Sequence, residues 1–334
     1  GYKFAFPRDH ASHDQYKTEW WYFTGHLNTA KKRQFGYELT FFRTALDQEE
    51  DSSSPWNLRN IYLAHFAITD PDGKKFFFRE RINRAGVGFA DARQDVPYVY
   101  NQDWSMKFVG EKIQLQAHTP EYSLNLTLSP KKVPTIHGKN GVSQKASCRG
   151  CASHYYSLTR LETEGTLALN GQSQKVSGLS WMDHEFGSNQ LTDQQVGWDW
   201  FSLQLDNNCE VMLYLMRNAD GSLDPNSSGT ITMPDGTTKH LALADFSVKS
   251  LHTWHSIRTG GNYPLDWTVE IPAAKAKITV TALMSDQELV TTGSTGVTYW
   301  EGASSVSGSW NGTPASGDAY VEMTGYAEKF KNKI

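Results

Sequence analysis

The stretch HYYSLTRLETEGTLALNGQSQKVSGLSWMDHEFG, residues 154–187, decides the fold. Two runs rich in aromatic, aliphatic and Thr side chains flank Asn170-Gly171, a dipeptide typical of tight turns because Gly accepts a positive φ. Runs of this kind separated by a turn dipeptide indicate antiparallel strands. We therefore predict one small meander, in which the two runs lie near each other.

The same pattern returns near the end of the chain. TYWEGASSVSG, which begins at Thr298, leads through Asn311-Gly312 to YVEMTGY. Earlier motifs return in the same order: WYFTGHLN at Trp21 is echoed by WFSLQLDN at Trp200, and YELTFFR, ending at Arg43, by VMLYLMR, ending at Arg217. An ordered set of repeats favours an internal duplication. We predict two related all-β domains, residues 1–190 and 191–334, whose meanders close into barrels or fold into sandwiches, because open sheets would leave aggregation-prone edges.

Composition agrees with this fold and excludes some functions. The 334 residues include 11 Trp, 15 Tyr and 16 Phe, which favour strands over a helical bundle. The net charge of −4 and the scattered Lys and Arg argue against nucleic acid as a partner. No apolar run approaches the roughly 20 residues of a membrane helix. The chain opens at Gly1 without Met, as expected for a mature or trimmed chain whose signal segment, if any, has been removed. Two insertions stand out: 46–57 is expected to be an exposed acidic loop, and 131–150 a mobile flap.

Several kinds of site are poorly supported. The sequence contains no GxSxG elbow, P-loop or complete dinucleotide-binding pattern. Cys148 and Cys151 precede a strand instead of opening a helix, so we expect a local disulfide or spectator thiols. The HxxH motif at 10–13 and His184 do not show the three or four converging ligands that zinc needs. We expect no metal and no cofactor.

The segments 18–27, 154–160 and 181–187 are dense in large functional side chains. Residues two apart share one face of a strand, so Trp181 lies beside Asp183. An acid lined by aromatic rings would be desolvated, its pKa would rise, and it could act as a general acid. The alternative is structural: inward aromatic residues are more often core, and a buried Asp can simply hold a loop or pair with Arg160 or Arg217.

The motifs TEWWYFTGHL, ASHYYSLTRL, SWMDHEFG, YWEGASSVSGSWNG and YVEMTGY resemble the AttH family, a lipocalin-like group that also contains carotenoid 1,2-hydratase (hydroxyneurosporene synthase). The resemblance runs from Phe6 to Tyr326. It implies two consecutive lipocalin-like antiparallel β-barrels. It also implies an exported, periplasmic or membrane-associated protein, in many bacteria linked to an ABC-type exporter.

The resemblance also implies site residues. In the hydratases a His, an aromatic two places on, a second aromatic and an Asp two places after it are thought to act. By motif these are His154, Tyr156, Trp181 and Asp183, although the hydratases usually have Trp first and Tyr second, the reverse of this chain. That exchange puts a carotenoid substrate in doubt more than the chemistry. Further ligand-binding side chains are expected at Trp20, Trp21, Tyr22, His65, Glu185, Trp198 and Trp200.

These expectations describe a pocket for an apolar isoprenoid, carotenoid or acyl-like molecule, with acid-assisted hydration of a carbon–carbon double bond. Asp183 would be the acid, Trp181 and Tyr156 the π faces that stabilise a cation, and His154 the base that delivers water or the partner that sets the Asp proton. A non-catalytic periplasmic carrier or exporter subunit would use the same cavity. A carbohydrate-binding module would instead need a flat, exposed row of Trp side chains.

Overall fold

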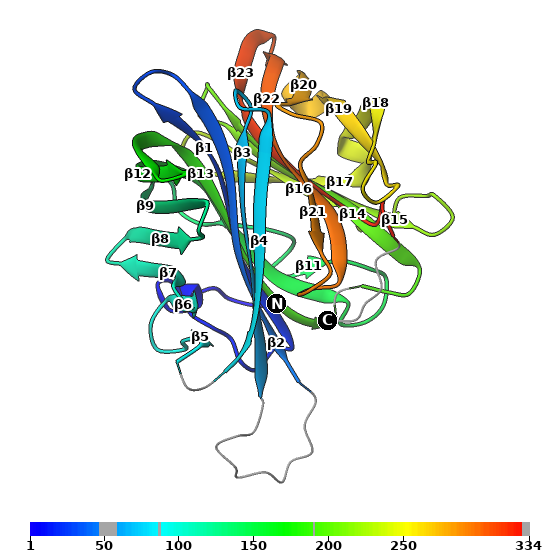
Figure 1. The fold of residues 1–334 in the computed structure, drawn as a ribbon. Helices are drawn as coiled ribbons and strands as arrows, with labels where there is room; N and C mark the ends of the chain where they lie inside the picture. Colours follow the sequence, from blue (N-terminus) through cyan, green and yellow to red (C-terminus); the bar gives the residue numbers. More distant parts are fainter. Residues whose placement is uncertain (47–58, 86–87, 190, 329–334) are drawn as a thin grey trace.

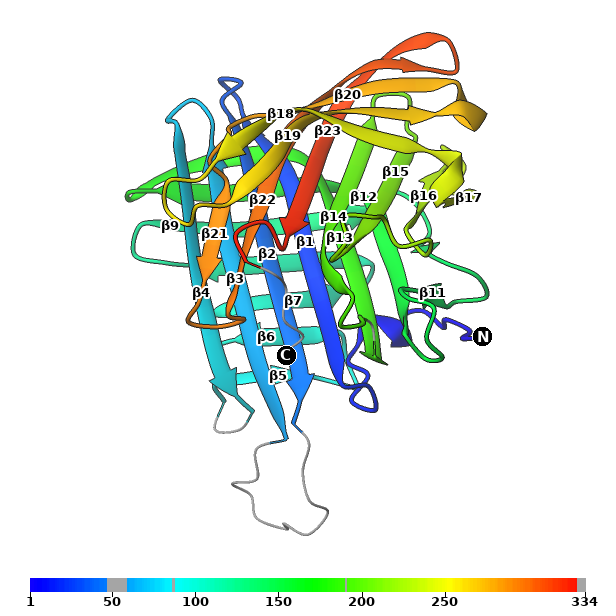
Figure 2. The same ribbon diagram turned by 90° about the vertical axis from the view of Figure 1, so that its right-hand side faces the viewer.

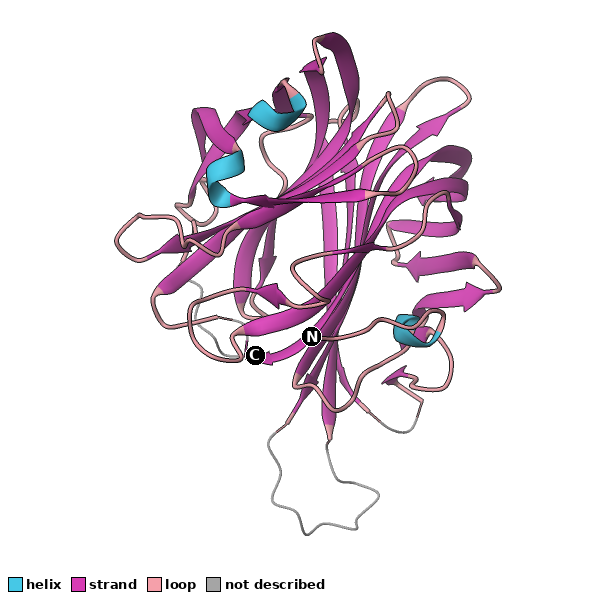
Figure 3. Ribbon diagram, turned by 180° about the vertical axis from the view of Figure 1, so that it is seen from behind, coloured by secondary structure: helices cyan, strands magenta, loops and turns pink. Residues whose placement is uncertain are grey.

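The computed structural model describes residues 1–46, 59–85, 88–189 and 191–328, so the predicted acidic loop, apart from Leu46, lies outside the described part of the chain. Regular structure is almost entirely β, as expected (Figure 3). Helix is confined, among these residues, to three 3₁₀ turns: η1 (Arg8–His10), η2 (Leu243–Asp245) and η3 (Pro272–Ala274). None of these turns is long or apolar enough to cross a membrane.

The first sheet is antiparallel, in the spatial order β4-β3-β2-β1-β13-β12-β9-β8-β7-β6-β5, with β10 and β11 on the margin of β12 (Figure 1). Its strands are β1 (Thr18–Thr29), β2 (Gln34–Ala45), β3 (Asn60–Asp70), β4 (Lys75–Arg84), β5 (Ala90–Ala92), β6 (Tyr98–Asn101), β7 (Trp104–Val109), β8 (Lys112–His118), β9 (Tyr122–Pro130), β10 (Thr135–Ile136), β11 (Ser143–Gln144), β12 (Ala152–Leu169) and β13 (Gln172–Asn189).

The second sheet is also antiparallel, in the order β17-β16-β15-β14-β23-β22-β20-β19-β18, with β21 paired to β22. Its strands are β14 (Gln195–Leu205), β15 (Glu210–Asn218), β16 (Ser228–Thr232), β17 (Thr238–Ala242), β18 (Ser247–His255), β19 (Asn262–Ile271), β20 (Ala276–Ala282), β21 (Glu288–Thr291), β22 (Val297–Trp310) and β23 (Thr313–Thr324).

The two sheets share one topology. In each, the first strand pairs with the last, β1 with β13 and β14 with β23, and the next three strands extend the sheet on one side. Each sheet curls into a barrel or half-barrel, and the two bodies pack against each other (Figure 2). The expected pair of lipocalin-like barrels related by duplication is therefore confirmed.

Strands β4 and β5 lie at the two ends of the first sheet and do not pair with each other in the described structure. Side chains connect these two edges of the barrel instead. Asn101 on β6 is buried and lies between the two margins. Its Nδ2 donates to the carbonyl of Tyr62 on β3 at 3.2 Å, and its Oδ1 accepts from Asn83 Nδ2 on β4 at 2.6 Å. Arg81 Nη1 donates to the Asn101 carbonyl at 2.9 Å. Polar side chains thus bridge the seam that the ladder leaves open.

Each barrel has its own apolar core, and a third cluster lies between them. Phe23, Leu39 and Met182 belong to the first core, and Phe201 and Val321 to the second. The cluster between the barrels, formed by strands of both sheets, consists of Tyr22, Tyr155, Trp181, Trp200, Met212, Tyr214, Met216, Ala303 and Tyr320. Strands β1 to β3 and β14 to β16 are consequently buried on both faces, whereas β8 alternates strictly between buried and exposed residues.

The β12–β13 hairpin contains a β-bulge that controls the site. Leu161 pairs with Ser180 and Leu158 with Met182, so two residues of β12, Thr159 and Arg160, oppose only Trp181 on β13. A bulge of this kind changes which face the rest of the strand presents. Even-numbered residues of β12 before the bulge and odd-numbered residues after it therefore face the first core.

The segment 131–150, expected to be a flap, packs against the second barrel. His137 and Lys145 are buried, and Lys132 Nζ lies 2.7 Å from the buried carboxylate of Glu210 on β15. The segment ends in a disulfide between Cys148 and Cys151, one of the two expected outcomes. This packing supplies part of the wall between the barrels.

We predict that Asn101→Ala weakens the first barrel at its seam. Removing Asn101 leaves the Asn83 amide and the Tyr62 carbonyl without these partners, and such losses cost about 1–3 kcal/mol of the free energy of unfolding. Asn125→Ala, on the exposed face of β9, is the control and should stay within about 0.5 kcal/mol of the wild type. Urea unfolding measures both, and equal effects would show that the seam is not held in this way.

Candidate functional site

A cavity of about 350 Å³ lies between the two barrels. Its walls come from β1, β2, β3, β12 and β13 of the first sheet and from β14, β15 and β23 of the second, with Lys145 and the β21–β22 region completing it. The lining is mainly apolar and aromatic, including Phe42, Leu191, Met216 and Val297. The wall also carries many polar and charged side chains, so the cavity can take an apolar molecule and orient it through polar groups.

Most of the side chains predicted to bind a ligand lie on this wall. The cavity is lined by Trp20, Tyr22, His65, Glu185, Trp198 and Trp200. Trp21 lies elsewhere, because odd-numbered residues of β1 face the first core. Its Nε1 donates to the carbonyl of His10, and its ring stacks on His184 at 4.8 Å.

Asp183 is the polar centre of the wall. It is 4 % exposed and accepts three hydrogen bonds. Tyr155 Oη donates to Oδ2 at 2.6 Å, whereas Ser157 Oγ at 2.5 Å and Trp181 Nε1 at 2.6 Å donate to Oδ1. Trp200 from the second barrel donates to Tyr155 Oη at 3.0 Å, so both barrels orient this carboxyl.

The protonation of Asp183 follows from its surroundings. Burial raises the pKa of Asp183 to about 7 against the three hydrogen bonds, which favour the carboxylate, and the nearby charge of Glu185 raises it further. The carboxyl is therefore balanced between its acid and base forms near neutral pH. This agrees with the sequence-based expectation of a desolvated acid.

His154 and Tyr156 do not share the cavity with Asp183, so the expected grouping of four side chains is wrong. Across the hairpin Asp183 pairs with Ser157 and Tyr156 with His184, and directly paired residues lie on one face of a sheet. Without the bulge at Thr159, Asp183 would pair with an even-numbered residue of β12 and all four would face one way. The bulge turns Tyr156 and His154 toward the N-terminal segment instead.

Tyr155, Ser157 and His137 hold Asp183 but were missed from the sequence. Ser157 donates to Asp183, so its oxygen accepts from His137 Nε2 at 2.7 Å, and Thr230 Oγ1 then donates to His137 Nδ1 at 2.8 Å. Burial lowers the pKa of His137 well below its usual value, which keeps it neutral. Tyr155 is in the predicted motif, but only the position of the bulge shows that its side chain faces Asp183. No spacing in the sequence predicts that His137 lies near Asp183.

Lys145 and Glu185 form a second polar pair on the wall, with Lys145 Nζ 2.9 Å from Glu185 Oε1. The Lys145 ammonium also lies 4.4 Å from the ring centre of Tyr214 and 4.9 Å from that of Tyr155. The positive charge of Lys145 therefore contacts Tyr155, which itself donates a hydrogen bond to Asp183.

Three further carboxyl groups, those of Glu38, Glu301 and Glu322, gather between the barrels. Glu301 and Glu322 are direct partners across β22 and β23, and no ion pair within the described structure neutralises any of the three. Burial, together with Glu322 and Glu38, raises the pKa of Glu301 well above its usual value. Burial raises the pKa of Glu322, which lines the cavity, to about 7.

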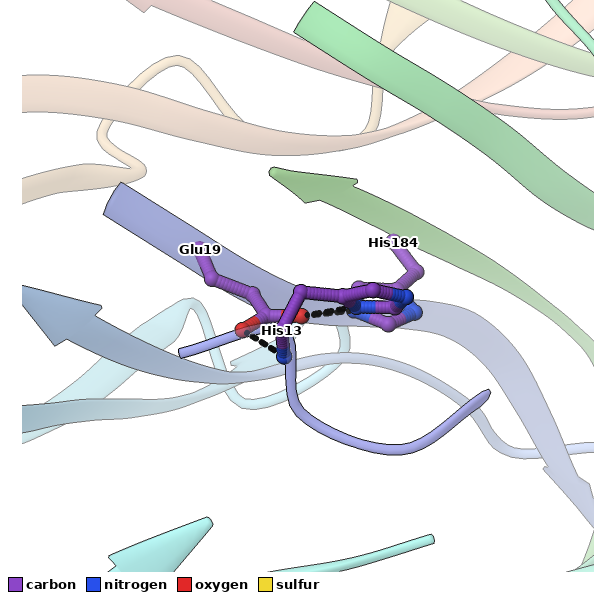
Figure 4. Close-up of side chains that lie close together, drawn as sticks. All are labelled: His13, Glu19 and His184. Carbon is purple, nitrogen blue, oxygen red and sulfur yellow. Dashed lines mark hydrogen bonds and ion pairs between the residues drawn. The ribbon is translucent and has the colours of Figure 1, made fainter. Parts of the chain in front are cut away.

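A separate polar cluster lies on the opposite face of β13. His13, Glu19 and His184 converge there, as Figure 4 shows, and residues two to ten of the chain cover them. No spacing in the sequence connects His13 and His184 to Glu19, which lies on another strand.

Comparisons with known proteins agree with this architecture. The family profile described as AttH-like matches residues 1–326. A crystal structure of an AttH protein from Nitrosomonas europaea is 32% identical, has a TM-score of 0.88 and covers 98% of each chain. Kievitone hydratase from Nectria haematococca is 16% identical with a TM-score of 0.74, covering 97% of this chain and 93% of its own, and shows the fold alone.

A curated relative adds a chemical class. The dehydratase asqC of Emericella nidulans is 27% identical over 223 residues, which is 63% of this chain. The match spans 60% of the relative's own length.

We predict that Glu301→Gln makes stability less sensitive to pH. Folded Glu301 stays protonated at pH values where the unfolded chain ionises it, so the wild type loses stability as pH rises from its ordinary pKa, about 4.5, toward the raised folded value. The effect is at most about 1.4 kcal/mol per pH unit.

Urea unfolding between pH 5 and 8 measures this effect. Glu270→Gln, whose side chain is exposed, is the control and should follow the wild type. Parallel pH curves for wild type and Glu301→Gln would contradict the prediction.

Proposed function

Because the chain belongs to the AttH-like family, we propose that it is a hydro-lyase that adds or removes water at a carbon–carbon double bond. Its substrate is an apolar isoprenoid, carotenoid or acyl-like molecule held between the barrels. The observation that carries this proposal is Asp183, a buried carboxyl with a pKa of about 7 on an aromatic cavity wall.

The wall suits a reaction that passes through a cation. Protonating an alkene carbon leaves positive charge on its neighbour, and the faces of Trp200 and Tyr22 can stabilise that charge. The apolar side chains of the cavity would limit contact between the cation and bulk water.

The proton balance can be closed with the residues of this wall. In hydration, protonated Asp183 transfers its proton to one alkene carbon, water bonds to the other, and the added water then loses a proton. Glu322, the second cavity carboxyl whose pKa is about 7, can accept that proton. Proton exchange with solvent then restores the acid form of Asp183 and the base form of Glu322 before the next turnover. Dehydration is the same sequence in reverse. His154, expected to be the base, faces away from the cavity and is not needed in this scheme.

The relatives support the class of reaction. One is named a dehydratase and another kievitone hydratase, so both names concern the addition or loss of water. A non-catalytic carrier, in an exported setting, would use the same cavity but would not require an acid balanced near neutral pH.

We predict that Asp183→Asn lowers turnover by about 100- to 10,000-fold, the usual contribution of general acid catalysis. The probe is an acyclic polyene with an unsaturated isoprenoid end group. Product is detected by mass spectrometry in ¹⁸O-labelled water, which places the label in the new hydroxyl, and affinity by quenching of Trp fluorescence. The amide keeps the shape of the carboxyl, so affinity should remain nearly unchanged.

Asp199→Asn is the matched control. Asp199 is also buried but bonds to Tyr326 and pairs with Arg217, and it does not line the cavity, so turnover should persist. Full turnover in Asp183→Asn would contradict the assigned acid. Binding without product in the wild type would favour the carrier.

Because Glu322 must be ionised to accept a proton, we expect wild-type hydration to be slower well below pH 7. It should also decline as pH rises above about 7, because the acid form of Asp183 is lost. The decline should be absent from the residual rate of Asp183→Asn. A pH profile of kcat that stays flat from pH 6 to 8 in the wild type would oppose this assignment.

A further inference from the structure

His13, Glu19 and His184 form a buried cluster that the proposed reaction does not use. His13 comes from the N-terminal segment, Glu19 from β1 and His184 from β13, and each is at most 1 % exposed. His13 Nδ1 and His184 Nε2 each lie 2.8 Å from Glu19 Oε1. The three potential ligand atoms lie within 4.8 Å of one another (Figure 4).

The far side of each ring is held by a second group. His13 Nε2 lies 3.2 Å from the carboxylate of Asp9, and His184 Nδ1 lies 3.0 Å from Tyr156 Oη. Metal-binding imidazoles usually donate their second N–H to a carboxylate or another oxygen, which fixes the ring and its tautomer. Both rings of this cluster have such a partner.

The two carboxylate oxygens of Glu19 make different contacts. Its Oε2 accepts from the His13 backbone N–H at 2.8 Å, from Ser12 Oγ at 3.1 Å and from Arg43 Nε at 3.2 Å. These contacts hold the side chain and leave Oε1 directed at the two rings. Glu19 is therefore arranged as a ligand through a single oxygen.

The hydrogen bonds are complete when an ion lies between the three atoms. Each ring then keeps one N–H, which His13 donates to Asp9 and His184 donates to Tyr156. Tyr156 Oη can in turn donate to His10 Nδ1, which lies 2.6 Å away. Without an ion, Glu19 Oε1 must accept from both rings, and His13 needs a second proton to face Asp9.

We propose that His13 Nδ1, Glu19 Oε1 and His184 Nε2 bind a divalent transition-metal ion, with zinc the best fit. Two imidazoles and one carboxylate are a common zinc ligand set, and the ligand atoms need to move by about 1 Å or less to reach zinc–ligand distances near 2.0–2.2 Å. Three protein ligands leave a fourth position for water. Calcium and magnesium are disfavoured, because they prefer oxygen ligands.

The ion would fasten the N-terminal segment to the first barrel. His184 follows Asp183 on β13, so their side chains lie on opposite faces of the strand, although Glu19 also contributes to the lining of the cavity. The segment carrying His13 packs over Phe186 and Tyr156, and its only metal ligand is His13. We expect metal binding to raise the thermal stability of the protein and to order this segment.

Cobalt binding to the full chain, stripped of metal with a chelator, tests the proposal. Co²⁺ should bind with one-to-one stoichiometry and give the visible absorption of a four- or five-coordinate ion with nitrogen and oxygen ligands. Zn²⁺ should displace it and raise Tm. Proton NMR of the Co²⁺ protein should show two strongly shifted, exchangeable imidazole N–H signals, one from each ring.

Variants separate the cluster from adventitious surface binding. Glu19→Gln should weaken Zn²⁺ by at least about 100-fold, and Asp9→Asn, which removes the carboxylate partner of His13 without replacing a ligand, by about 10- to 100-fold. His154→Gln removes a neighbouring imidazole outside the cluster and should leave the affinity unchanged.

Each result has a defined reading. If Glu19→Gln does not fold, the NMR signals of the wild type and the Asp9→Asn affinity still decide the question. A wild type that binds no stoichiometric Co²⁺, or one that loses its site only in His154→Gln, would overturn the proposal and leave a hydrogen-bonded cluster.

Discussion

The structure depends on sheets that are buried on both faces. Strands β1 to β3 turn one set of side chains into the first barrel and the alternate set toward the second barrel. The second barrel does the same with β14 to β16. Because successive side chains point to opposite faces, most residues on these strands belong either to a core or to the wall between the barrels. The cavity, the acid and the polar cluster are all consequences of that division.

This constraint explains what the sequence could and could not predict. The repeated motifs predicted two related barrels, because motifs that recur in the same order along the chain form strands in the same order in each sheet. The pairing of Trp181 with Asp183 was correct, because it needs only the two-residue period of one strand. The pairing of Asp183 with His154 and Tyr156 needed the register between two strands. One extra residue near Thr159 changes that register, and no local pattern marks it.

The sequence also did not predict the contacts between residues that are far apart in the chain. His137 reaches Asp183 through Ser157 from a segment that looked like a flap, and Glu19 joins His13 to His184 from three separate parts of the chain. Such groupings depend on tertiary packing, so spacing along the sequence cannot supply them. The continuous run TEWWYFTG did carry a signal, since a strand buried on both faces loses the usual alternation.

The wall between the barrels also concentrates buried acids. Asp183, Glu301 and Glu322 all have raised pKa values, because they are removed from water and, apart from Lys145 beside Glu185, meet few positive charges in the described structure. A wall of this kind costs stability at higher pH. Acidic groups that remain protonated near neutral pH are common at sites of proton transfer, and this is the physical basis for placing the chemistry here.

The most direct test is the titration of Asp183 itself. Carboxyl ¹³C NMR of protein labelled at Asp, with Asp183→Asn to assign the signal, measures its pKa in the folded chain. The account predicts that the carboxyl signal missing from Asp183→Asn titrates near pH 7 in the wild type. An Asp183 that is already ionised at pH 5 would contradict it, because a carboxylate stabilised to that extent could not protonate an alkene.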